Sequence, residues 1–288
     1  MTPGPRPSQN ARYCVLGHPV LHSQSPFIHA AFARQTGEPV EYGRIDCGPD
    51  GFEAAVRRFA AEGGGGCNVT LPFKFDAPRL AARCSQRALL AGAANTLRFD
   101  PEGWSADNTD GIGLLRDLQD HAGFEVGGRR VLLVGAGGAG AGVLGPLLQS
   151  RPAELVLVNR SPQRALALVE RHAQLARDAG VVLLTAPIDS PGPRFDLVIN
   201  ATAASLQQGR IPVPDEVLAP EALAVDLMYG DAAKDFLAWA RLRGARARDG
   251  LGMLVEQAAE AFHFWRRVRP CTAPVLAALR ARLEGVAK

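Results

Sequence analysis

The stretch Arg130-Val131-Leu132-Leu133-Val134, followed at once by Gly135-Ala136-Gly137-Gly138-Ala139-Gly140, decides the fold. Its short apolar, β-branched run predicts a buried strand, and the Ala- and Leu-rich segment up to about Gln149 predicts a helix. Glycines 135, 137 and 140 form a G-x-G-x-x-G pattern between the two. In this context the pattern indicates a dinucleotide-binding turn, with the helix N-terminus facing the phosphates, although a purely structural glycine turn is the alternative.

Strands and helices alternate on both sides of this turn. After it we predict strands at 154–158, 181–184 and 196–199 and a helix at 162–179, which is typical of a parallel, doubly wound sheet. Before it, residues 12–111 alternate in the same way and predict a separate α/β domain, with strands at 13–16, 42–45 and 66–70 and helices at 26–35 and 51–61.

The last part of the chain carries one more helix pattern. Apolar residues recur on one helical face between Leu254 and Arg267, so we expect this helix to return to the first domain. The predicted fold class is therefore α/β with two domains. Residues 1–111 and 253–288 form one of them, and residues 112–252 form a Rossmann-type nucleotide-binding domain.

The residues after the second strand of the central domain indicate which dinucleotide is bound. An NAD site places Asp or Glu there, about 20 residues after the glycines, whereas this chain has Asn159-Arg160-Ser161, with Arg164 one helical turn later. Because a guanidinium can pair bidentately with a 2′-phosphate, the sequence favours NADPH. Solvated arginines at a strand end are the alternative.

Composition excludes several classes of protein. With 47% hydrophobic and 21% charged residues, the chain has the composition of a globular protein. Its net charge of +3 is not concentrated in any block, so neither nucleic acid nor a membrane is an expected partner. It has neither an apolar run near the roughly 20 residues of a membrane helix nor a signal-peptide pattern, so we expect a cytoplasmic protein. The five cysteines lack disulfide or zinc-ligand spacing, so no metal is expected.

Two serines in the first domain are candidates for binding an acid. Ser23 and Ser25 alternate on an extended segment before Pro26, so their hydroxyls would project to the same side beside a helix N-terminus. Together they could hold a carboxylate. A simple helix N-cap is the alternative for Ser25.

Several further motifs occur in a definite order, and together with the glycine turn they resemble the shikimate dehydrogenase family over residues 13–266. They are Asn68-Val69-Thr70-Leu71-Pro72-Phe73-Lys74, Gly92-Ala93-Ala94-Asn95-Thr96-Leu97, Asp107-Asn108-Thr109-Asp110-Gly111, Asp226-Leu227-Met228-Tyr229 and the segment from Asp249 to Ala258. The resemblance implies NADPH-dependent, reversible reduction of 3-dehydroshikimate to shikimate, a step of aromatic amino-acid and chorismate biosynthesis. Asp231 and Lys234 depart from it, because the family usually has Pro and Thr at these positions near the nicotinamide.

The resemblance also implies roles for particular residues. Lys74 and Asp110 become the catalytic pair, and Ser23 and Ser25 the ligands of the substrate carboxylate. Thr70, Asn95, Tyr229 and Gln257 would contact the substrate carboxylate or its ring hydroxyls. Cofactor contacts fall to Gly135, Ala136, Gly137, Gly138, Ala139, Asn159, Arg160, Arg164, Leu227 and Gly250. Residues 1–111 and 253–288 would bind substrate, and residues 112–252 would bind NADP.

Lysine is rare in this chain, so the lysine at position 74 suggests a site that needs proton exchange and not only positive charge. Only Lys74, Lys234 and Lys288 among the 32 cationic residues are lysine, and lysine, unlike arginine, can be tuned to exchange a proton. Hydride addition to a ketone carbon makes its oxygen alkoxide-like, so we predict that Lys74 donates a proton there while Asp110 orients it. A structural ion pair between the two is the alternative.

Two other functions remain open at this stage. A quinate/shikimate dehydrogenase paralogue could use NAD, but Ser23, Ser25 and Arg160 favour the shikimate and NADP branch. A catalytically silent NADP-binding sensor would not need Lys74 together with Asp110. The sequence is compatible with a monomer or a homodimer.

Overall fold

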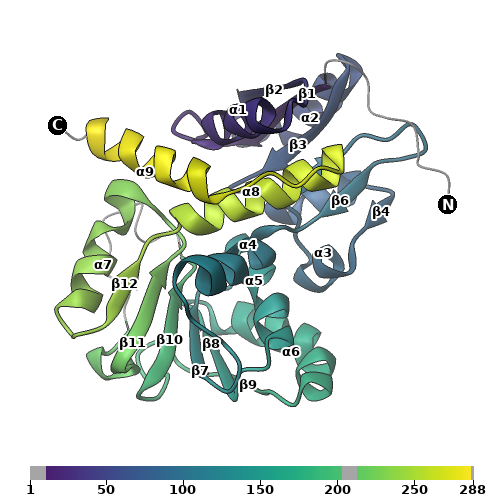
Figure 1. Ribbon diagram of the computed structural model, residues 1–288. Helices are drawn as coiled ribbons and strands as arrows, with labels where there is room; N and C mark the ends of the chain where they lie inside the picture. Colours follow the sequence, from purple (N-terminus) through teal and green to yellow (C-terminus); the bar gives the residue numbers. More distant parts are fainter. Residues whose placement is uncertain (1–10, 203–212, 287–288) are drawn as a thin grey trace. The chain divides into compact units, whose positions relative to one another are not determined.

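The computed structural model describes residues 11–202 and 213–286. Its contacts divide the chain into two compact units, Met1–Thr109 with Val255–Lys288, and Asp110–Leu254. Each unit is built on its own six-stranded sheet (Figure 1). None of the helices in the described part of the chain is long and apolar enough to cross a membrane.

The second unit contains the predicted parallel sheet. Its strand order is β12-β11-β10-β7-β8-β9, which read from the other edge is the 3-2-1-4-5-6 order of a Rossmann fold, so the predicted fold class is confirmed. The strands are β7 (Arg130–Val134), β8 (Glu154–Val158), β9 (Val182–Thr185), β10 (Phe195–Asn200), β11 (Leu218–Asp226) and β12 (Arg246–Arg248).

Helices cover this sheet and bury its central strands. They are α4 (Asp110–Arg116), which runs on into a π-helical turn at Asp117–His121, α5 (Gly138–Gln149), α6 (Pro162–Ala179) and α7 (Lys234–Arg241). In Figure 1, α6 lies beside β8 and β9 while α7 lies beside β11 and β12. Because both faces are covered, the strands are nearly continuous apolar runs, with Leu132, Val156 and Val198 side by side in register.

The first unit has a mixed sheet of order β2-β1-β3-β5-β6-β4. Strands β2, β1 and β3 are parallel, and β5 is antiparallel to both β3 and β6. The strands are β1 (Ala11–Gly17), β2 (Val40–Asp46), β3 (Gly64–Val69), β4 (Arg83–Cys84), β5 (Thr96–Arg98) and β6 (Ser105–Asp107). Its helices include α1 (Ser25–Thr36), α2 (Phe52–Ala61), α3 (Gln86–Ala91) and α9 (Ala273–Val286).

Helix α8 (Leu251–Arg266) carries the chain back into the first unit, as predicted. The Trp265 ring stacks on Tyr13 with a centroid distance of 4.4 Å, and its Nε1 donates a hydrogen bond to Leu97 O at 2.9 Å. Gly66 makes room for it, because a Cβ at that position would lie 2.7 Å from the Trp265 Nε1. An apolar cluster of Ala11, Tyr13, Ala261 and Trp265 thus fixes α8 against β1.

Candidate active site

The glycine turn in the second unit has the geometry that a pyrophosphate requires. Gly135 has a φ of 116°, and a Cβ at Gly140 would lie 1.9 Å from Gly135 O. By contrast, apart from Gly137 and its chain neighbours, no described residue has an atom within 4 Å of the place where a Cβ would sit at Gly137. Gly137 is the N-cap of α5, and no side chain caps the helix, so no side-chain bond satisfies the first N–H groups of α5.

Asn159 ties this turn to the end of β8. Its Oδ1 accepts a hydrogen bond from Ala136 N at 3.1 Å, and its Nδ2 donates to Ser161 O at 2.9 Å. The next side chain, Arg160, is exposed, as is Arg164 in the first turn of α6. No described residue forms a hydrogen bond or ion pair with either guanidinium. Among the described residues, two arginines without a partner therefore stand at the end of β8 and the start of α6, where they could pair with a ribose phosphate.

Leu227 and Gly250 lie together beyond the carboxyl ends of β11 and β12. A Cβ at Gly250 would lie 2.3 Å from Leu227 O, and Gly250 N donates to Met228 O at 2.9 Å. The partly exposed Tyr229 follows in the same loop. Asp231 and Lys234, the residues that depart from the family pattern, form an exposed ion pair with each other at 2.5 Å. This pair lowers the pKa of the Asp231 carboxyl.

In the first unit, Ser23 and Ser25 contact each other. The Ser23 hydroxyl donates to Ser25 Oγ at 3.1 Å, and Ser25 N donates to Ser23 Oγ at 3.3 Å. Ser25 is the first residue of α1, whose N-cap is Gln24, so it is not the cap that the alternative interpretation required. Arg44, to which the sequence analysis gave no role, fixes the segment by donating two hydrogen bonds to Ser23 O, at 2.6 and 3.0 Å.

A polar chain leads inward from the serines through Tyr42 and Asn68. Asn68 Nδ2 donates to the carbonyl of Asn95 at 3.1 Å, which fixes the orientation of its amide because a carbonyl can only accept. Its Oδ1 then accepts from the Tyr42 hydroxyl at 2.7 Å, which leaves the Tyr42 oxygen to interact with Ser25. Burial raises the pKa of Tyr42 well above its usual value, so this hydroxyl keeps its proton.

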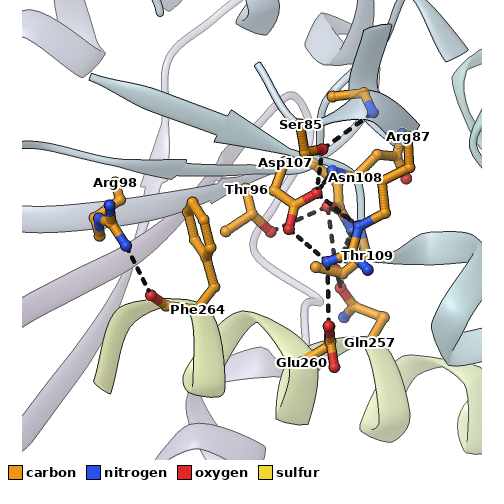
Figure 2. A network of polar contacts seen from close by, with 12 residues as sticks. Ser85, Arg87, Thr96, Arg98, Asp107, Asn108, Thr109, Gln257, Glu260 and Phe264 are labelled. Carbon is orange, nitrogen blue, oxygen red and sulfur yellow. Dashed lines mark hydrogen bonds and ion pairs between the residues drawn. The ribbon is translucent and has the colours of Figure 1, made fainter. Parts of the chain in front are cut away.

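The chain continues to Asn95 and Gln257. Asn95 is buried, and its Nδ2 donates to Gln257 Oε1 at 3.1 Å and to Thr109 Oγ1 at 2.9 Å. Its Oδ1 accepts from Thr109 N at 2.8 Å. Figure 2 shows Thr109, in the loop after β6, beside Gln257 of α8. Two predicted substrate contacts, Asn95 and Gln257, are thus brought together by α8.

The Asp107 carboxylate fixes the start of the loop that carries Thr109 and Asp110. The Asp107 carboxylate accepts hydrogen bonds from Ser85, from Arg87 and from Asn108 N, at 2.5 to 2.7 Å (Figure 2). Arg87 also pairs with Glu260 of α8 at 3.1 Å. Burial lowers the pKa of Arg87, but the hydrogen bonds and charges of Asp107 and Glu260 together outweigh this, and the net shift is upward. Asp107 stands in a motif that the sequence shows, whereas no local sequence pattern indicated Arg87 or Glu260.

Thr70 and Lys74 lie just beyond β3 in the first unit. Thr70 N donates to Leu16 O at 2.9 Å, and the Thr70 methyl group fills the space that a Cβ at Gly17 would need. Lys74 lies in the 3-10 turn Phe73–Phe75, and its carbonyl accepts from Ala94 N at 2.8 Å, one residue before Asn95. Asp110 is buried and begins α4 in the second unit.

His29 lies on α1, one turn after Ser25, and makes the free energy of unfolding depend on pH. It is fully buried on α1 and stacks on Tyr42 with ring centroids 4.1 Å apart. Burial lowers the pKa of His29 to about 3, so the folded protein keeps the ring neutral where the unfolded chain, with a pKa of ~6.5, takes up a proton. Above about pH 6.5 both states keep the ring neutral and His29 adds no pH-dependent penalty; below it the unfolded chain takes up the proton and the fold loses stability as the pH falls.

We expect His29 to cost about 2 kcal/mol of unfolding free energy between pH 7 and pH 5. Urea titrations of the wild type and of His29→Phe at both pH values measure this. The variant should lose about 2 kcal/mol less than the wild type over the interval. Equal losses of unfolding free energy in the two proteins would show that His29 is not the titrating group. The other buried histidine, His172, is present in both proteins, so its own contribution cancels in the comparison.

Family models match most of the chain. The model described as "Shikimate dehydrogenase substrate binding domain" matches residues 15–97, "Shikimate / quinate 5-dehydrogenase" matches residues 118–210, and "Shikimate 5'-dehydrogenase C-terminal domain" matches residues 250–280. The first and second matches fall on the first and second units, respectively.

Individual proteins agree with these models. The chain is 62% identical to "Shikimate dehydrogenase (NADP(+))" of Methylibium petroleiphilum, over 95% of each chain. Among solved structures it is 48% identical to an Ael1 enzyme from Pseudomonas putida, with a TM-score of 0.85, covering 94% of this chain and 98% of the other. It is 31% identical to the shikimate 5-dehydrogenase of Thermus thermophilus in complex with NADP(H) and shikimate, with a TM-score of 0.79 and coverage of 94% and 99%.

Proposed function

Because this chain belongs to the shikimate dehydrogenase family, we propose that its two units divide the work between substrate and cofactor. It is an NADP-dependent oxidoreductase that reversibly reduces 3-dehydroshikimate to shikimate. Residues 1–111 and 253–288 bind the substrate, and residues 112–252 bind NADP. As an enzyme of aromatic amino-acid biosynthesis it works in the cytoplasm.

The polar chain from Ser23 to Gln257 is the observation that carries the substrate assignment. It ends in hydroxyl and amide groups, which are the donors and acceptors that a carboxylate and ring hydroxyls need. Ser23 and Ser25 take the carboxylate. Thr70, Asn95, Tyr229 and Gln257 take the carboxylate or the ring hydroxyls.

The uncapped start of α5 and the two guanidiniums that have no partner among the described residues support the NADP assignment. NADPH supplies the hydride when it is bound. Gly135 to Ala139 receive its pyrophosphate, Asn159 holds the turn, and Arg160 with Arg164 pairs with the 2′-phosphate. Leu227 and Gly250 contact the cofactor beyond β11 and β12.

Lys74 and Asp110 perform the proton transfer in this proposal. The ketone oxygen gains negative charge as its carbon is reduced, and the Lys74 ammonium donates a proton to it. In the oxidation of shikimate the neutral amine takes that proton back. Asp110 keeps the ammonium oriented, and the groups that bind the ring hold the ketone in place, which supplies a large share of the acceleration.

A single spectrophotometric assay tests the proposed function. The purified protein should reduce NADP+ in the presence of shikimate, with a lower kcat/KM for quinate and for NAD+. A higher kcat/KM with quinate and NAD+ would identify a quinate dehydrogenase. NADP+ binding without turnover of either substrate would identify a sensor.

Alanine at Ser23 or Ser25 is expected to raise the KM for shikimate about tenfold, because each hydroxyl donates to a charged group and such bonds contribute at least about 1.5 kcal/mol. Steady-state kinetics at saturating NADP+ measures the effect, and kcat should change much less. A KM equal to that of the wild type in both variants would assign these serines to the structure of the α1 N-terminus alone.

A further inference from the structure

The second unit contains a buried ion pair that the proposed mechanism does not use. Asp117, in the π-helical turn after α4, has a fully buried side chain. Its two carboxylate oxygens accept hydrogen bonds from Arg248 Nε at 2.8 Å and from Arg248 Nη2 at 2.5 Å. This bidentate geometry fixes the direction of both side chains, and the bond to Asp117 raises the pKa of Arg248.

Each partner of this pair belongs to a segment that leads to a proposed active-site residue. Asp117 lies seven residues after Asp110, two turns along the helix that Asp110 begins and on the same face. Arg248 ends β12, two residues before Gly250. The ion pair therefore joins the helix of the proposed catalytic carboxylate to the turn of a proposed cofactor contact.

Gly252 adds a direct contact between Asp117 and the turn that holds Gly250. A Cβ at Gly252 would lie 1.7 Å from Asp117 Oδ1, so the carboxylate rests against the backbone at the start of α8. Only glycine fits this contact. The Asp117 side chain thus limits the path of the backbone from Arg248 to Gly252 on both sides of Gly250.

Arg246 strengthens the same attachment. Side chains two residues apart on a strand project to the same side, and Arg246 Nη2 donates to Ala122 O at 2.6 Å while Arg248 Nη1 lies 3.5 Å from His121 O. Both guanidiniums thus lie at the carboxyl end of the helical segment from Asp110 to His121, where a cation interacts favourably with the partial negative charge of the helix terminus. β12 is thereby attached to that segment by two side chains.

The order of strands would place Gly250 near the nicotinamide end of a bound cofactor. The 2′-phosphate site follows β8, the pyrophosphate site follows β7, and Leu227 and Gly250 follow β11 and β12 on the other side of β10. A dinucleotide that lies across the carboxyl ends of the strands therefore extends from the adenosine end at β8 toward the nicotinamide end at β11 and β12.

We propose that the Asp117–Arg248 ion pair positions the Gly250 turn, and with it the nicotinamide ring, relative to the helix that begins at Asp110. This inference rests on the proposed function, because it takes Gly250 as a cofactor contact. Stability alone gives little reason for the pair, since apolar residues of similar volume often stabilise a buried site as well as an ion pair does. Asp117 and Arg248 are positioning residues and do not touch the reacting atoms.

The test compares the full cofactor with its adenosine fragment. Arg248→Lys keeps a cation beside the buried carboxylate, so the protein should fold, and it removes the bidentate geometry; Arg248→Met removes the charge as well. Isothermal titration measures the Kd of NADP+ and of 2′,5′-ADP, which carries the 2′-phosphate and the adenosine 5′-phosphate but neither the second phosphate of the pyrophosphate nor the nicotinamide. We expect about a tenfold weaker NADP+ and about a tenfold lower kcat for Arg248→Lys, with 2′,5′-ADP within about twofold of the wild type.

Arg243→Met is the matched control, because Arg243 pairs with Asp215 in the same unit and lies in no proposed site. It should lower Tm without changing either Kd. Equal weakening of NADP+ and 2′,5′-ADP by the Arg248 variants, or no change in either, would overturn the positioning role. A wild-type protein that binds NADP+ but does not oxidise shikimate would contradict the proposed function, and the two titrations would still decide the inference.

Discussion

Lys74→Arg is expected to lower kcat at least ~100-fold, the low end of a general acid–base contribution, while NADPH affinity stays near that of the wild type. Arginine keeps the positive charge of Lys74. A guanidinium, however, stays protonated throughout the working pH range and cannot give up a proton and regain it. In a chain where arginine is the usual cation, a site that needed only charge could have used arginine.

Size and charge need separate controls in this experiment. Arginine is longer than lysine and could block the ketone, so Lys74→Met, nearly isosteric and uncharged, is measured beside it. Retention of most of the kcat in Lys74→Arg would refute proton transfer by Lys74.

Asp110→Asn belongs to the same experiment. It removes the charge that orients the Lys74 ammonium in the proposed mechanism and should lower kcat as well. If the two residues act as a unit, the double variant should lose far less than the product of the single losses. Multiplicative losses would instead indicate two independent contributions.

Arg160→Ala is expected to weaken NADPH binding by about 2 kcal/mol, roughly thirtyfold in Kd, and to leave NADH nearly unchanged. The side chain is exposed and has no ion pair with a described residue, so the substitution breaks no ion pair within the described part of the chain. The loss then reports the missing bond to the 2′-phosphate.

Fluorescence titration with both cofactors measures this specificity. Arg171→Ala is the matched control, because Arg171 is an exposed arginine of the same helix, α6, two turns beyond Arg164. It should leave both affinities unchanged. Equal losses of NADPH and NADH binding in Arg160→Ala would remove the argument for 2′-phosphate recognition by Arg160.

The central part of the fold was predictable from the sequence because its signals are local. The predicted bounds of β7, β8 and α6 agree with the structure. A buried parallel strand is a continuous apolar run, and a glycine turn requires backbone conformations that Gly135 adopts most readily. Residues that are neighbours in the chain determine these features, so a single sequence contains them.

The short strands β4, β5 and β6 were not predicted. They have two or three residues each, too few to show a period, and they are strands only because neighbouring strands supply their hydrogen bonds. The three-residue strand β12 and the helix α7 were missed as well. Pairing of such segments depends on the folded sheet, so local propensity does not reveal it.

The sequence by itself determined which residues could carry the chemistry, because Ser23, Lys74 and Arg160 stand in recognisable motifs. Only the tertiary structure decided which distant side chains bond to one another around these motifs. Tyr42 meets Asn68 across 26 residues, Arg87 meets Glu260 across 173, and Asp117 meets Arg248 across 131. Bonds of this kind form between side chains that the fold brings together, so no spacing in the sequence reports them.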